Sequence, residues 1–509
     1  MIVPFPLRAT ERDVIRADMS LFTIEEVLEV TSARLLLGDR AGLHRKIRRL
    51  CSDSREVGSG DLFVAFKGER FDGHDFVAQA LRKGAVGALL ESGSEAASFL
   101  LRSRSGEPAP FVMGVSDALL AYQQLATYHR NRFQIPIVAV TGSNGKTTTK
   151  EMVARVLDER WRVLVTEGNL NNRIGVPRTL LQLNARHDAA VIEMGVDRKG
   201  QTTRLADIAR PTIGLITNIG PDHLEFFGTM EASAEAKGEL LDRLGSEDTA
   251  VLNADDPYFG YLASRAHCRV VSFGLSPTAL VRATEVRSDA KGMTFRLRLP
   301  GRVRPTPVTL PAHGFHNLLN ALAAAAVGYV CELSGAKIAQ GLLHFRPATM
   351  RSQVERVGGI TVINDCYNAN PASMKAAVDL LTELGAGTHT VAVLGDMLEL
   401  GPQASAFHRE IGAHVAAGGI TSLVTCGALG RAIAEGARTA GMTDDRIAEC
   451  VDAQRAIPQV LSMAHPGDVV LVKGSRGMRM EQVVEALRAR PSESSRKKTQ
   501  SMVGKGVKR

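Results

Sequence analysis

The segment that most constrains the fold is residues 135–151, where an apolar run leads into a glycine-rich turn and then into a helical stretch. The run IPIVAV at 135–140 has the composition of a buried strand, and TGSNGKTTTKE follows it directly. In such a turn, small residues let backbone N–H groups close on a phosphate, and the N-terminus of the next helix adds a favourable dipole. The segment therefore predicts an α/β sheet with a phosphate site at the end of one strand.

The predicted ATP site is this loop, whose residues are Gly142, Ser143, Asn144, Gly145, Lys146, Thr147 and Thr148. We expect Lys146 to reach the β and γ phosphates and Thr147 to ligate magnesium. The strict GxxxxGK[ST] pattern requires glycine at position 140, where the chain has Val140, so the match is to a shorter GxxGKTT pattern. A glycine-rich turn that only caps a helix is the alternative, but the preceding strand and the Lys-Thr pair favour ATP binding.

The length of 509 residues predicts about three domains. Apolar runs that end in polar residues alternate with helical stretches, as in AAVIEMG, IGLITNIG and TAVLNADD, and the alternation restarts beyond Pro347 with GITVINDCY, HTVAVLGDM, SLVTCG and DVVLVKGS. Ligands gather at the carboxyl ends of such strands. We expect an α/β protein with a smaller N-terminal domain (1–115), a central domain with a mainly parallel sheet (116–346), a Rossmann-like C-terminal domain (347–490) and a basic disordered tail (491–509).

Composition excludes several other classes. Apolar residues make up 44% and charged residues 23%, which is typical of folded globular proteins. No apolar run reaches the length of a membrane span and the N-terminus lacks the pattern of a signal peptide, so we expect a cytoplasmic protein. The six cysteines form no CxxC pair, which argues against a zinc ribbon or a disulfide framework. Most of the formal charge of +8 comes from the tail, to which no function is assigned.

The chain resembles the Mur ligases and their folylpolyglutamate synthetase relatives, which are ATP-dependent amide-forming ligases. AVTGSNGKTTTKEM looks like their nucleotide loop, and GNLNNRIGVPRTLL (168–181), EMGVDRKGQ (193–201) and TNIGPDHLEFFGTMEASAEAKGELL (217–241) follow in order. The ends of the chain indicate the type. DSREVGSGDLFVAFKGERFDGHDF (53–76) is similar to the UDP-sugar-binding domain of the later peptide-adding Mur ligases. NDCYNANPASMKAAV (364–378), LGDMLELG (394–401) and VKGSRGMRME (472–481) look like the type that adds D-alanyl-D-alanine to UDP-N-acetylmuramoyl-tripeptide.

The resemblance implies a catalytic and metal-binding set of residues. A carboxylate must first take the γ-phosphoryl group of ATP to become an acyl phosphate, so the protein neutralises charge and positions the reactants. Thr147 and Glu193 would supply oxygen ligands to Mg²⁺, His223 would ligate a second magnesium, and Lys237 would carry a carbamate. The residues alone favour a helix-capping or core histidine for His223 over a metal ligand, and for Lys237 an exposed helix residue with a glutamate nearby.

The resemblance also implies substrate contacts in the three domains. Asn317 would contact adenine, Asp365 ribose and Arg351 the phosphate side of ATP, while the alternatives are a helix N-cap for Asn317 and a strand-end turn for Asp365. The uridine and diphosphate loops would comprise Ser54, Arg55, Lys67, Asp72, Gly73 and His74, each of which could instead belong to a solvated turn. ATP and magnesium are the implied cofactors, and we expect a monomer with no nucleic-acid partner.

The chain departs from the family pattern at a few positions. Arg173, Gln201, Thr202, Met350 and Cys366 replace the usual residues, which puts substrate preference and affinity in doubt more than the type of reaction. Two other functions stay open. One is a Mur-type ligase that adds a different amino acid, and the other is a non-catalytic ATP-binding regulator or nucleic-acid-binding ATPase that uses the tail, against which the low aromatic content of 5% counts. The third residue of the acceptor peptide, lysine or diaminopimelate, is not predicted.

Overall fold

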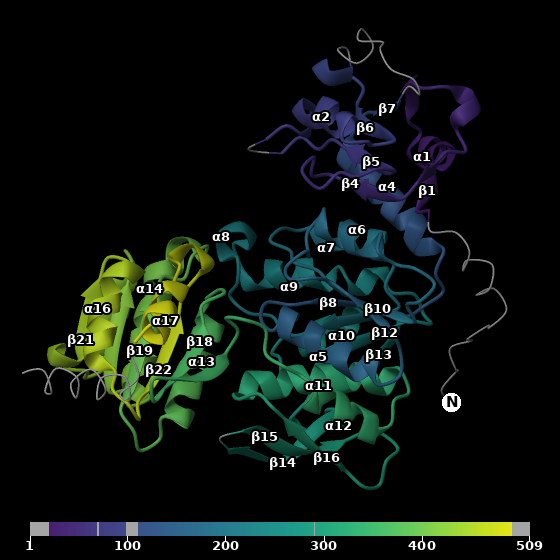
Figure 1. Cartoon of the computed structure of the whole chain (residues 1–509). Helices are drawn as coiled ribbons and strands as arrows, with labels where there is room; N and C mark the ends of the chain where they lie inside the picture. The colour runs from purple at the N-terminus through teal and green to yellow at the C-terminus, as the bar shows by residue number, and fades with distance from the viewer. Residues whose placement is uncertain (1–19, 69–70, 98–109, 290, 491–509) are drawn as a thin grey trace, which may run out of the picture. The chain divides into compact units, whose positions relative to one another are not determined.

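The computed structural model describes residues 20–68, 71–97, 110–289 and 291–490 (Figure 1). Two compact units share this part of the chain. The first comprises Met1–Ala139, Trp161–Met194 and Thr203–Pro211, and the second comprises Val140–Arg160, Gly195–Thr202 and Thr212–Arg509. The tail at 491–509 lies outside the described residues. The expected domain boundaries near residues 115 and 347 stay predictions.

The first unit contains a five-stranded sheet with the order β2-β7-β6-β5-β4 (Figure 1). Strands β4 to β7 are parallel neighbours and β2 joins antiparallel at one edge. Successive residues alternate between two cores, because Leu62 and Val64 pack on one face while Phe63 and Ala65 pack on the other. The elements are β1 (Phe22–Thr23), α1 (Ile24–Thr31), β2 (Arg34–Leu37), β3 (Lys46–Ile47), β4 (Arg49–Cys51), β5 (Asp61–Val64), α2 (Val77–Arg82), β6 (Gly87–Glu91), β7 (Phe111–Val115) and α4 (Ala118–Asn131).

A nine-stranded sheet, whose strands come from both units, has the order β16-β15-β14-β13-β12-β11-β8-β10-β9. Each pair from β11 to β14 is parallel, as is β9 with β10, whereas β14, β15 and β16 are antiparallel. The strands are β8 (Ile137–Thr141), β9 (Val163–Val165), β10 (Ala189–Glu193), β11 (Ile213–Ile216), β12 (Thr249–Asn253), β13 (Arg269–Gly274), β14 (Val281–Asp289), β15 (Gly292–Arg298) and β16 (Thr306–Leu310).

The helices between these strands and after the last of them begin with α5, which follows the predicted phosphate loop directly. The expected helix over GFHNLLNALAAAAVGYV is α11, one of the most apolar helices of the chain, and it is buried over most of its length. The helices are α5 (Lys146–Asp158), α6 (Gly175–Leu180), α7 (Gln201–Ala209), α8 (Leu224–Phe227), α9 (Met230–Gly238), α10 (Phe259–Arg265), α11 (Phe315–Val330) and α12 (Gly335–Leu343).

The mainly parallel character of the central sheet is confirmed, but its antiparallel edge was not predicted. In β15 the residues Met293, Phe295 and Leu297 are buried while Thr294 and Arg296 between them are exposed. A strand with one solvated face shows this alternation and has no continuous apolar run. Continuous apolar runs predict buried parallel strands only, so they do not predict β14 to β16.

The C-terminal part of the second unit contains a six-stranded sheet with the order β17-β18-β22-β19-β20-β21. All neighbours are parallel except β17 with β18. Two cores cover the two faces, since Ile363 and Leu471 pack with α13 to α15 while Val362 and Val470 pack with α16 and α17. The elements are β17 (Gln353–Val357), β18 (Ile360–Asp365), α13 (Pro371–Leu384), β19 (Thr390–Gly395), α14 (Ala404–Ala417), β20 (Ser422–Cys426), α15 (Gly430–Thr439), β21 (Ile447–Cys450), α16 (Ala453–Met463), β22 (Val469–Lys473) and α17 (Glu481–Arg488).

This sheet with helices on both faces confirms the expected Rossmann-like architecture. All four predicted strands are present as β18, β19, β20 and β22. The two edge strands β17 and β21 were not predicted, because they are short and only partly buried. Among the described residues, no helix is long and apolar enough to cross a membrane.

Candidate active site

The phosphate loop, residues 142–148, connects β8 to α5, and two of its glycines are required by its shape. Gly142 has φ +133°, and a Cβ there would lie 2.1 Å from Thr217 Oγ1. Gly145 is the N-cap of α5 with φ +78°, and a Cβ there would lie 2.3 Å from Asn320 Oδ1. Such positive φ values favour glycine. The N-terminus of the 13-residue helix α5 therefore opens onto a tight loop, as a phosphate site requires.

Lys146 lies across this loop. Its ammonium donates hydrogen bonds to the carbonyl oxygens of Gly142 at 2.6 Å and Ser143 at 3.2 Å. Both acceptors are loop carbonyls at the place where the loop's own amide groups would hold phosphate. The side chain is thus positioned to exchange carbonyl oxygens for phosphate oxygens.

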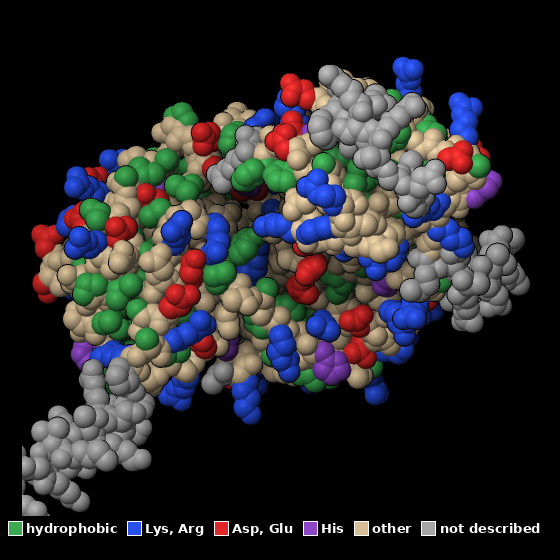
Figure 2. Space-filling view, turned by 45° about the horizontal axis from the view of Figure 1, so that its top comes forward, with side chains coloured by type: hydrophobic (Ala, Val, Ile, Leu, Met, Phe, Trp, Pro, Cys, Tyr) green, Lys and Arg blue, Asp and Glu red, His purple; other side chains and the backbone are tan. Residues whose placement is uncertain are grey.

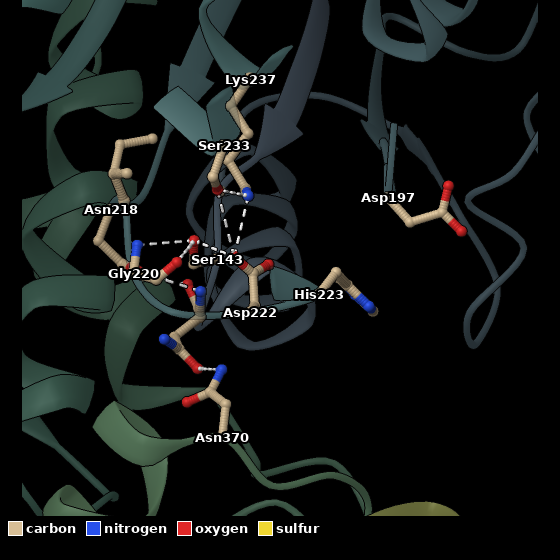
Figure 3. Close-up of polar contacts among 12 residues, drawn as sticks. Ser143, Asp197, Asn218, Gly220, Asp222, His223, Ser233, Lys237 and Asn370 are labelled. Carbon is tan, nitrogen blue, oxygen red and sulfur yellow. Dashed lines mark hydrogen bonds and ion pairs between the residues drawn. The ribbon is translucent and has the colours of Figure 1, made fainter. Parts of the chain in front are cut away.

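Residues that are not among the predicted site residues fix the loop in place. Asn218, just after β11, accepts a hydrogen bond from the Asn144 backbone N–H at 3.0 Å, and Thr217 Oγ1 donates to the Asn144 carbonyl at 2.6 Å. Asn370 Nδ2, at the N-cap of α13, donates to Asn144 Oδ1 at 2.7 Å (Figure 3). The segments TNIG and YNANP contain these residues, but neither segment by itself predicts a contact with the phosphate loop.

Lys237 is a buried residue of α9, and the alternative of an exposed helix lysine is wrong. Its side chain is 1% exposed, and its Nζ donates to Ser233 Oγ at 2.6 Å and to Asp222 Oδ1 at 3.0 Å (Figure 3). The ring of Phe227 lies under it at 4.6 Å. Burial lowers the pKa of Lys237 although the carboxylate of Asp222 acts to raise it. Burial therefore makes this ammonium easier to deprotonate than that of an exposed lysine.

Asp222 joins the lysine to the phosphate loop. Its Oδ1 also accepts a hydrogen bond from Ser143 Oγ at 2.5 Å, while its Oδ2 is buried and has no hydrogen-bond partner among the described residues. Burial acts to raise the pKa of Asp222, but the neighbouring cations Lys237 and Lys146 and the Ser143 hydroxyl keep it below its usual value. The carboxylate is thus held ionised inside the protein, with one oxygen open to a further partner.

His223 directly precedes α8 and has a left-handed backbone conformation with φ +52°. By position His223 is the N-cap residue of α8, as the helix-capping alternative expected, but its side chain makes no capping hydrogen bond. Nδ1 lies 2.6 Å from Glu399 Oε2, a residue of the segment LGDMLELG. A carboxylate beside Nδ1 places the proton on that nitrogen, which leaves Nε2 as the lone-pair donor.

Glu193 belongs to the first unit and is the last residue of β10. Its backbone N–H donates to Thr166 Oγ1 at 3.0 Å, and Asn171 Nδ2 donates to its Oε1 at 2.7 Å. Asn171 lies in the segment GNLNN (168–172), which follows β9. Thr147, the other expected oxygen ligand, is a buried residue of the second unit.

The three expected nucleotide contacts lie at different places in the second unit. Asn317 is buried in α11 behind the N-cap Gly314, so the N-cap alternative is wrong, and its amide bonds to His313 O and Asn320. The guanidinium of Arg351 lies 3.9 Å from the ring centroid of Tyr367. Asp365, the last residue of β18, accepts from Ser352 N at 2.9 Å and from Lys473 Nζ at 2.6 Å.

Met350 has φ +61°, at the position where the family usually has glycine. The backbone keeps the left-handed conformation that glycine adopts freely, at a cost of about 1–2 kcal/mol for a residue with a Cβ. This departure therefore preserves the loop that precedes Arg351.

The expected UDP loops lie around β5 and the 3-10 turn η3 (Gly73–Phe76) in the first unit. Asp72 caps this turn and accepts from His74 Nδ1 at 2.5 Å, while His74 Nε2 accepts from the Glu91 backbone N–H at 3.0 Å. Nε2 of His74 therefore ties the loop to β6, while Nδ1 holds the ring within the loop itself. Gly73 approaches Phe66 so closely that a Cβ would lie 2.7 Å from its carbonyl oxygen. Lys67 is exposed, and its backbone forms an isolated antiparallel β-bridge with that of Asp72.

The other two residues of this set lie in a second turn. Ser54 is buried and its Oγ donates to Gln79 Oε1 at 3.1 Å, whereas the exposed Arg55 pairs with Asp53 at 2.7 Å. Lys83, which was not singled out from the sequence, donates to the carbonyl oxygens of both Ser54 and Arg55. The first unit thus presents two exposed cations, Arg55 and Lys67, on turns that backbone contacts fix.

The chain is a nucleotide-binding α/β protein, because a phosphate loop connects a strand of a mainly parallel sheet to the helix that follows it. A further sheet has Rossmann-like topology. Three family models match in order: "Mur ligase family, catalytic domain" at residues 46–110, "Mur ligase middle domain" at 140–328 and "Mur ligase, glutamate ligase domain" at 350–476. The chain belongs to the Mur ligase family, as the sequence segments indicated.

Similar proteins extend over most of the chain. The UDP-N-acetylmuramoyl-tripeptide--D-alanyl-D-alanine ligase of Bacillus subtilis is 36% identical and aligns with 87% of this chain and 93% of its own. The Escherichia coli protein of the same name is 35% identical over 91% and 99%. Among solved structures, MurF from Acinetobacter baumannii has a TM-score of 0.83 at 31% identity, with 92% and 99% covered. MurF from Thermotoga maritima in complex with ADP has 0.75 at 28% identity, with 86% and 97% covered.

Proposed function

We propose that this chain is an ATP-dependent ligase that joins D-alanyl-D-alanine to UDP-N-acetylmuramoyl-tripeptide, a step of peptidoglycan precursor synthesis. The observation that carries the proposal is the similarity over about nine-tenths of the chain to ligases of that name. The phosphate loop supplies the ATP site that such a reaction needs. Because nearly the whole length of each relative is matched, the proposal covers all parts of the reaction.

The reaction proceeds in two balanced steps. A carboxylate oxygen of the tripeptide attacks the γ-phosphorus of ATP, and ADP leaves, which gives an acyl phosphate. The amine of D-alanyl-D-alanine then attacks the acyl carbon, loses a proton, and expels inorganic phosphate as the amide forms. Lys146 and the amide groups of the phosphate loop hold the β and γ phosphates and stabilise the charge that develops during transfer.

Thr147, Glu193, His223 and Lys237 form the proposed magnesium-binding set. Magnesium bound there would screen the negative charges of the phosphates. The hydroxyl of Thr147 and the carboxylate of Glu193 are oxygen donors of the kind that this ion prefers, and the open Nε2 of His223 is a nitrogen donor. Among the described residues no three His, Cys, Asp or Glu side chains gather into a group that could hold a metal.

We propose that Lys237 carries a carbamate. A neutral amine adds CO₂ and loses a proton to give N-linked carboxylate, and burial already lowers the pKa of this amine. The product would be an anionic oxygen ligand where an ammonium now lies. It would also turn the attraction between Lys237 and Asp222 into repulsion, which a bound cation would relieve.

The remaining residues divide between the two nucleotide substrates. Asn317, Arg351 and Asp365 are proposed to bind adenine, the phosphate side and ribose of ATP, and Ser54, Arg55, Lys67, Asp72, Gly73 and His74 to form the turns that bind the UDP part. On the face drawn in Figure 2, basic and acidic side chains are interspersed, and we propose no nucleic-acid partner. We propose a monomer that works in the cytoplasm, where ATP is available and thiols such as its six free cysteines stay reduced.

The test is release of inorganic phosphate with ATP, UDP-N-acetylmuramoyl-tripeptide and D-alanyl-D-alanine, each omitted in turn. Sustained phosphate release together with the UDP-linked pentapeptide should require all three. Equal turnover when another amino acid or dipeptide replaces D-alanyl-D-alanine would assign the chain to a different ligation. If the rate of phosphate release is the same with and without the UDP substrate, the proposed ligase function is wrong.

A further inference from the structure

Two charged residues meet at the carboxyl edge of the C-terminal sheet. Asp365 and Lys473 are the last residues of the neighbouring parallel strands β18 and β22, and they lie directly opposite each other in register. The lysine side chain is 2% exposed and the aspartate side chain 14% exposed. Lys473 Nζ donates to Asp365 Oδ2 at 2.6 Å and to the Asn368 carbonyl oxygen at 2.8 Å.

The other oxygen of Asp365 is also held. Its Oδ1 accepts a hydrogen bond from the Ser352 backbone N–H at 2.9 Å, which the left-handed conformation of Ser352 (φ +46°) directs at the carboxylate. Ser352 Oγ in turn lies 3.2 Å from Nε2 of His316, the residue before Asn317. The carboxylate is therefore fixed at both oxygens and linked to the start of α11.

A carboxylate held in this way keeps acceptor capacity. Each oxygen has two lone-pair positions and uses one of them here, so one position on each oxygen is left. A ribose presents two adjacent hydroxyl groups, and two acceptor oxygens in one plane match such a pair. Burying an ammonium is costly unless a counter-charge and further hydrogen bonds compensate for it, and here the compensating contact with Asp365 also fixes the orientation of the carboxylate.

We propose that Lys473 is a positioning residue for ATP: its ammonium fixes the plane of the Asp365 carboxylate so that both oxygens can accept the ribose hydroxyls. Lys473 itself does not touch the nucleotide. This inference rests on the proposed ATP-dependent function and on the proposed ribose contact of Asp365. It adds a residue from the segment VKGS, whose lysine is separated from Asp365 by more than a hundred residues of sequence.

The experiment compares ATP with 2′-deoxy-ATP, and the readout is the ratio of their kcat/KM values in the ligase reaction. The wild-type chain should prefer ATP by about tenfold or more, the factor expected for a hydrogen bond to a charged acceptor. Lys473→Met should lower kcat/KM for ATP about tenfold, through KM rather than kcat, and should lower that for 2′-deoxy-ATP much less, because only the contact of the 3′ hydroxyl remains there. The preference for ATP should then shrink severalfold, an effect that damage to the fold alone would not produce.

Three further variants separate the possible outcomes. Lys375→Met removes a partly exposed lysine of the same domain that pairs with Glu410, and it should keep the wild-type preference. Asp365→Asn should lose the preference; if it keeps it, the ribose contact itself is wrong. If Asp365→Asn loses the preference and Lys473→Met keeps it, the positioning role is wrong. Should Lys473→Met not fold, Lys473→Gln, which removes the charge but stays polar, decides by the same ratio.

Discussion

At the scale of single residues, Lys146 carries the most direct prediction, because its ammonium already lies over the carbonyl oxygens of the phosphate loop. Lys146→Ala should lower kcat by about a hundredfold to a thousandfold, the usual loss when one preorganised group that stabilises developing charge is removed. Steady-state phosphate release measures it, with a thermal melt to check that the fold is kept. A variant that turns over at the wild-type rate would show that the loop does not bind the transferred phosphate.

Lys237 carries a second prediction, which tests the carbamate. Lys237→Ala should be nearly inactive, and formate or acetate should restore part of the activity because a small carboxylate can occupy the vacated space, whereas chloride should not. In the wild-type chain, ¹³C-labelled bicarbonate should give a carbamate signal in the ¹³C spectrum that the variant lacks.

The matched control for Lys237 is Lys199→Ala. Lys199 is exposed and forms an ion pair with Glu235, which lies on α9 as Lys237 does. Its loss therefore removes a cation that contacts the same helix and leaves the hydrogen bonds of the buried Lys237 intact. This control should stay active and should not respond to formate. Full activity of Lys237→Ala, or a wild-type chain without the carbamate signal, would leave Lys237 as a buried structural lysine.

His129 predicts how stability depends on pH. Its Nε2 donates to the Leu183 carbonyl oxygen at 2.9 Å, its Nδ1 is buried without a partner among the described residues, and burial lowers its pKa to about 4. Between pH 6.5 and 4 the unfolded chain takes up a proton that the folded chain does not, so stability falls as the pH falls through this window. The expected loss from this residue is about 3 kcal/mol.

Urea unfolding at a series of pH values measures this effect. His129→Gln keeps a hydrogen-bond donor but does not titrate, so its unfolding free energy should vary less over the same window. If both chains lose stability in parallel from pH 6.5 to 4, His129 is not the group responsible.

At the scale of elements, continuous apolar runs predicted the buried parallel strands well, because a strand covered on both faces needs no polar positions. The loop between β8 and α5 was predicted for a similar reason, since its glycines and the Lys-Thr pair are local. Asp222 and Lys473 were not predicted as site residues, since each acquires its partner only when distant strands align. The burial of Lys237 likewise could not be predicted, because nothing in EASAEAKGEL shows that Ser233 and Asp222 accept hydrogen bonds from its amine.

The helix α13 connects the C-terminal sheet to the phosphate loop through one side chain. Asn370 Oδ1 caps the helix by accepting from Ser373 N, and Asn370 Nδ2 donates to Asn144 Oδ1. Asn370→Ser keeps a good N-cap but cannot reach Asn144. Its unfolding free energy should change by less than about 0.5 kcal/mol, while KM for ATP should rise about fivefold, which corresponds to the loss of one hydrogen bond.

The matched control for Asn370 is Ser373→Ala, which removes the reciprocal bond of the capping box and keeps the contact with Asn144. This variant should lose about 1 kcal/mol of stability and keep its KM for ATP. Steady-state kinetics and urea unfolding of both variants are compared. An unchanged KM in Asn370→Ser would show that the contact with Asn144 does not matter for nucleotide binding.

At the scale of the whole molecule, the proposed reaction needs groups from both compact units. The UDP turns and Glu193 belong to the first unit, whereas the phosphate loop, His223 and Lys237 belong to the second. Ligation requires the carboxylate of one substrate to meet the γ-phosphate of the other, so we expect the units to move during the catalytic cycle. No single segment of the sequence can therefore carry the activity alone.

The helix α4 provides a test of how the chain divides. Its residues Ala118, Ala121, Tyr122 and Leu125 are buried in the same core as Leu62, Val64 and Leu89 of the five-stranded sheet, and the ring of Tyr122 meets Phe66 edge-on. A fragment that ends at residue 115 lacks α4 and leaves this core exposed, whereas a fragment that ends at residue 134 includes the helix. Burial of Tyr122 and Leu125 alone is worth about 3–6 kcal/mol, a large part of the stability of a small domain.

We therefore expect the fragment of residues 1–134 to fold and to bind UDP, and the fragment of residues 1–115 to be largely unfolded at 25 °C. Circular dichroism and thermal melts measure folding, and calorimetric titration with UDP measures binding. Two fragments of equal stability would show that α4 belongs to the central part of the chain and that the boundary lies near residue 115. A folded longer fragment without affinity for UDP would instead reject the proposed UDP turns, because their contacts, from Asp53 to Glu91, all lie within it.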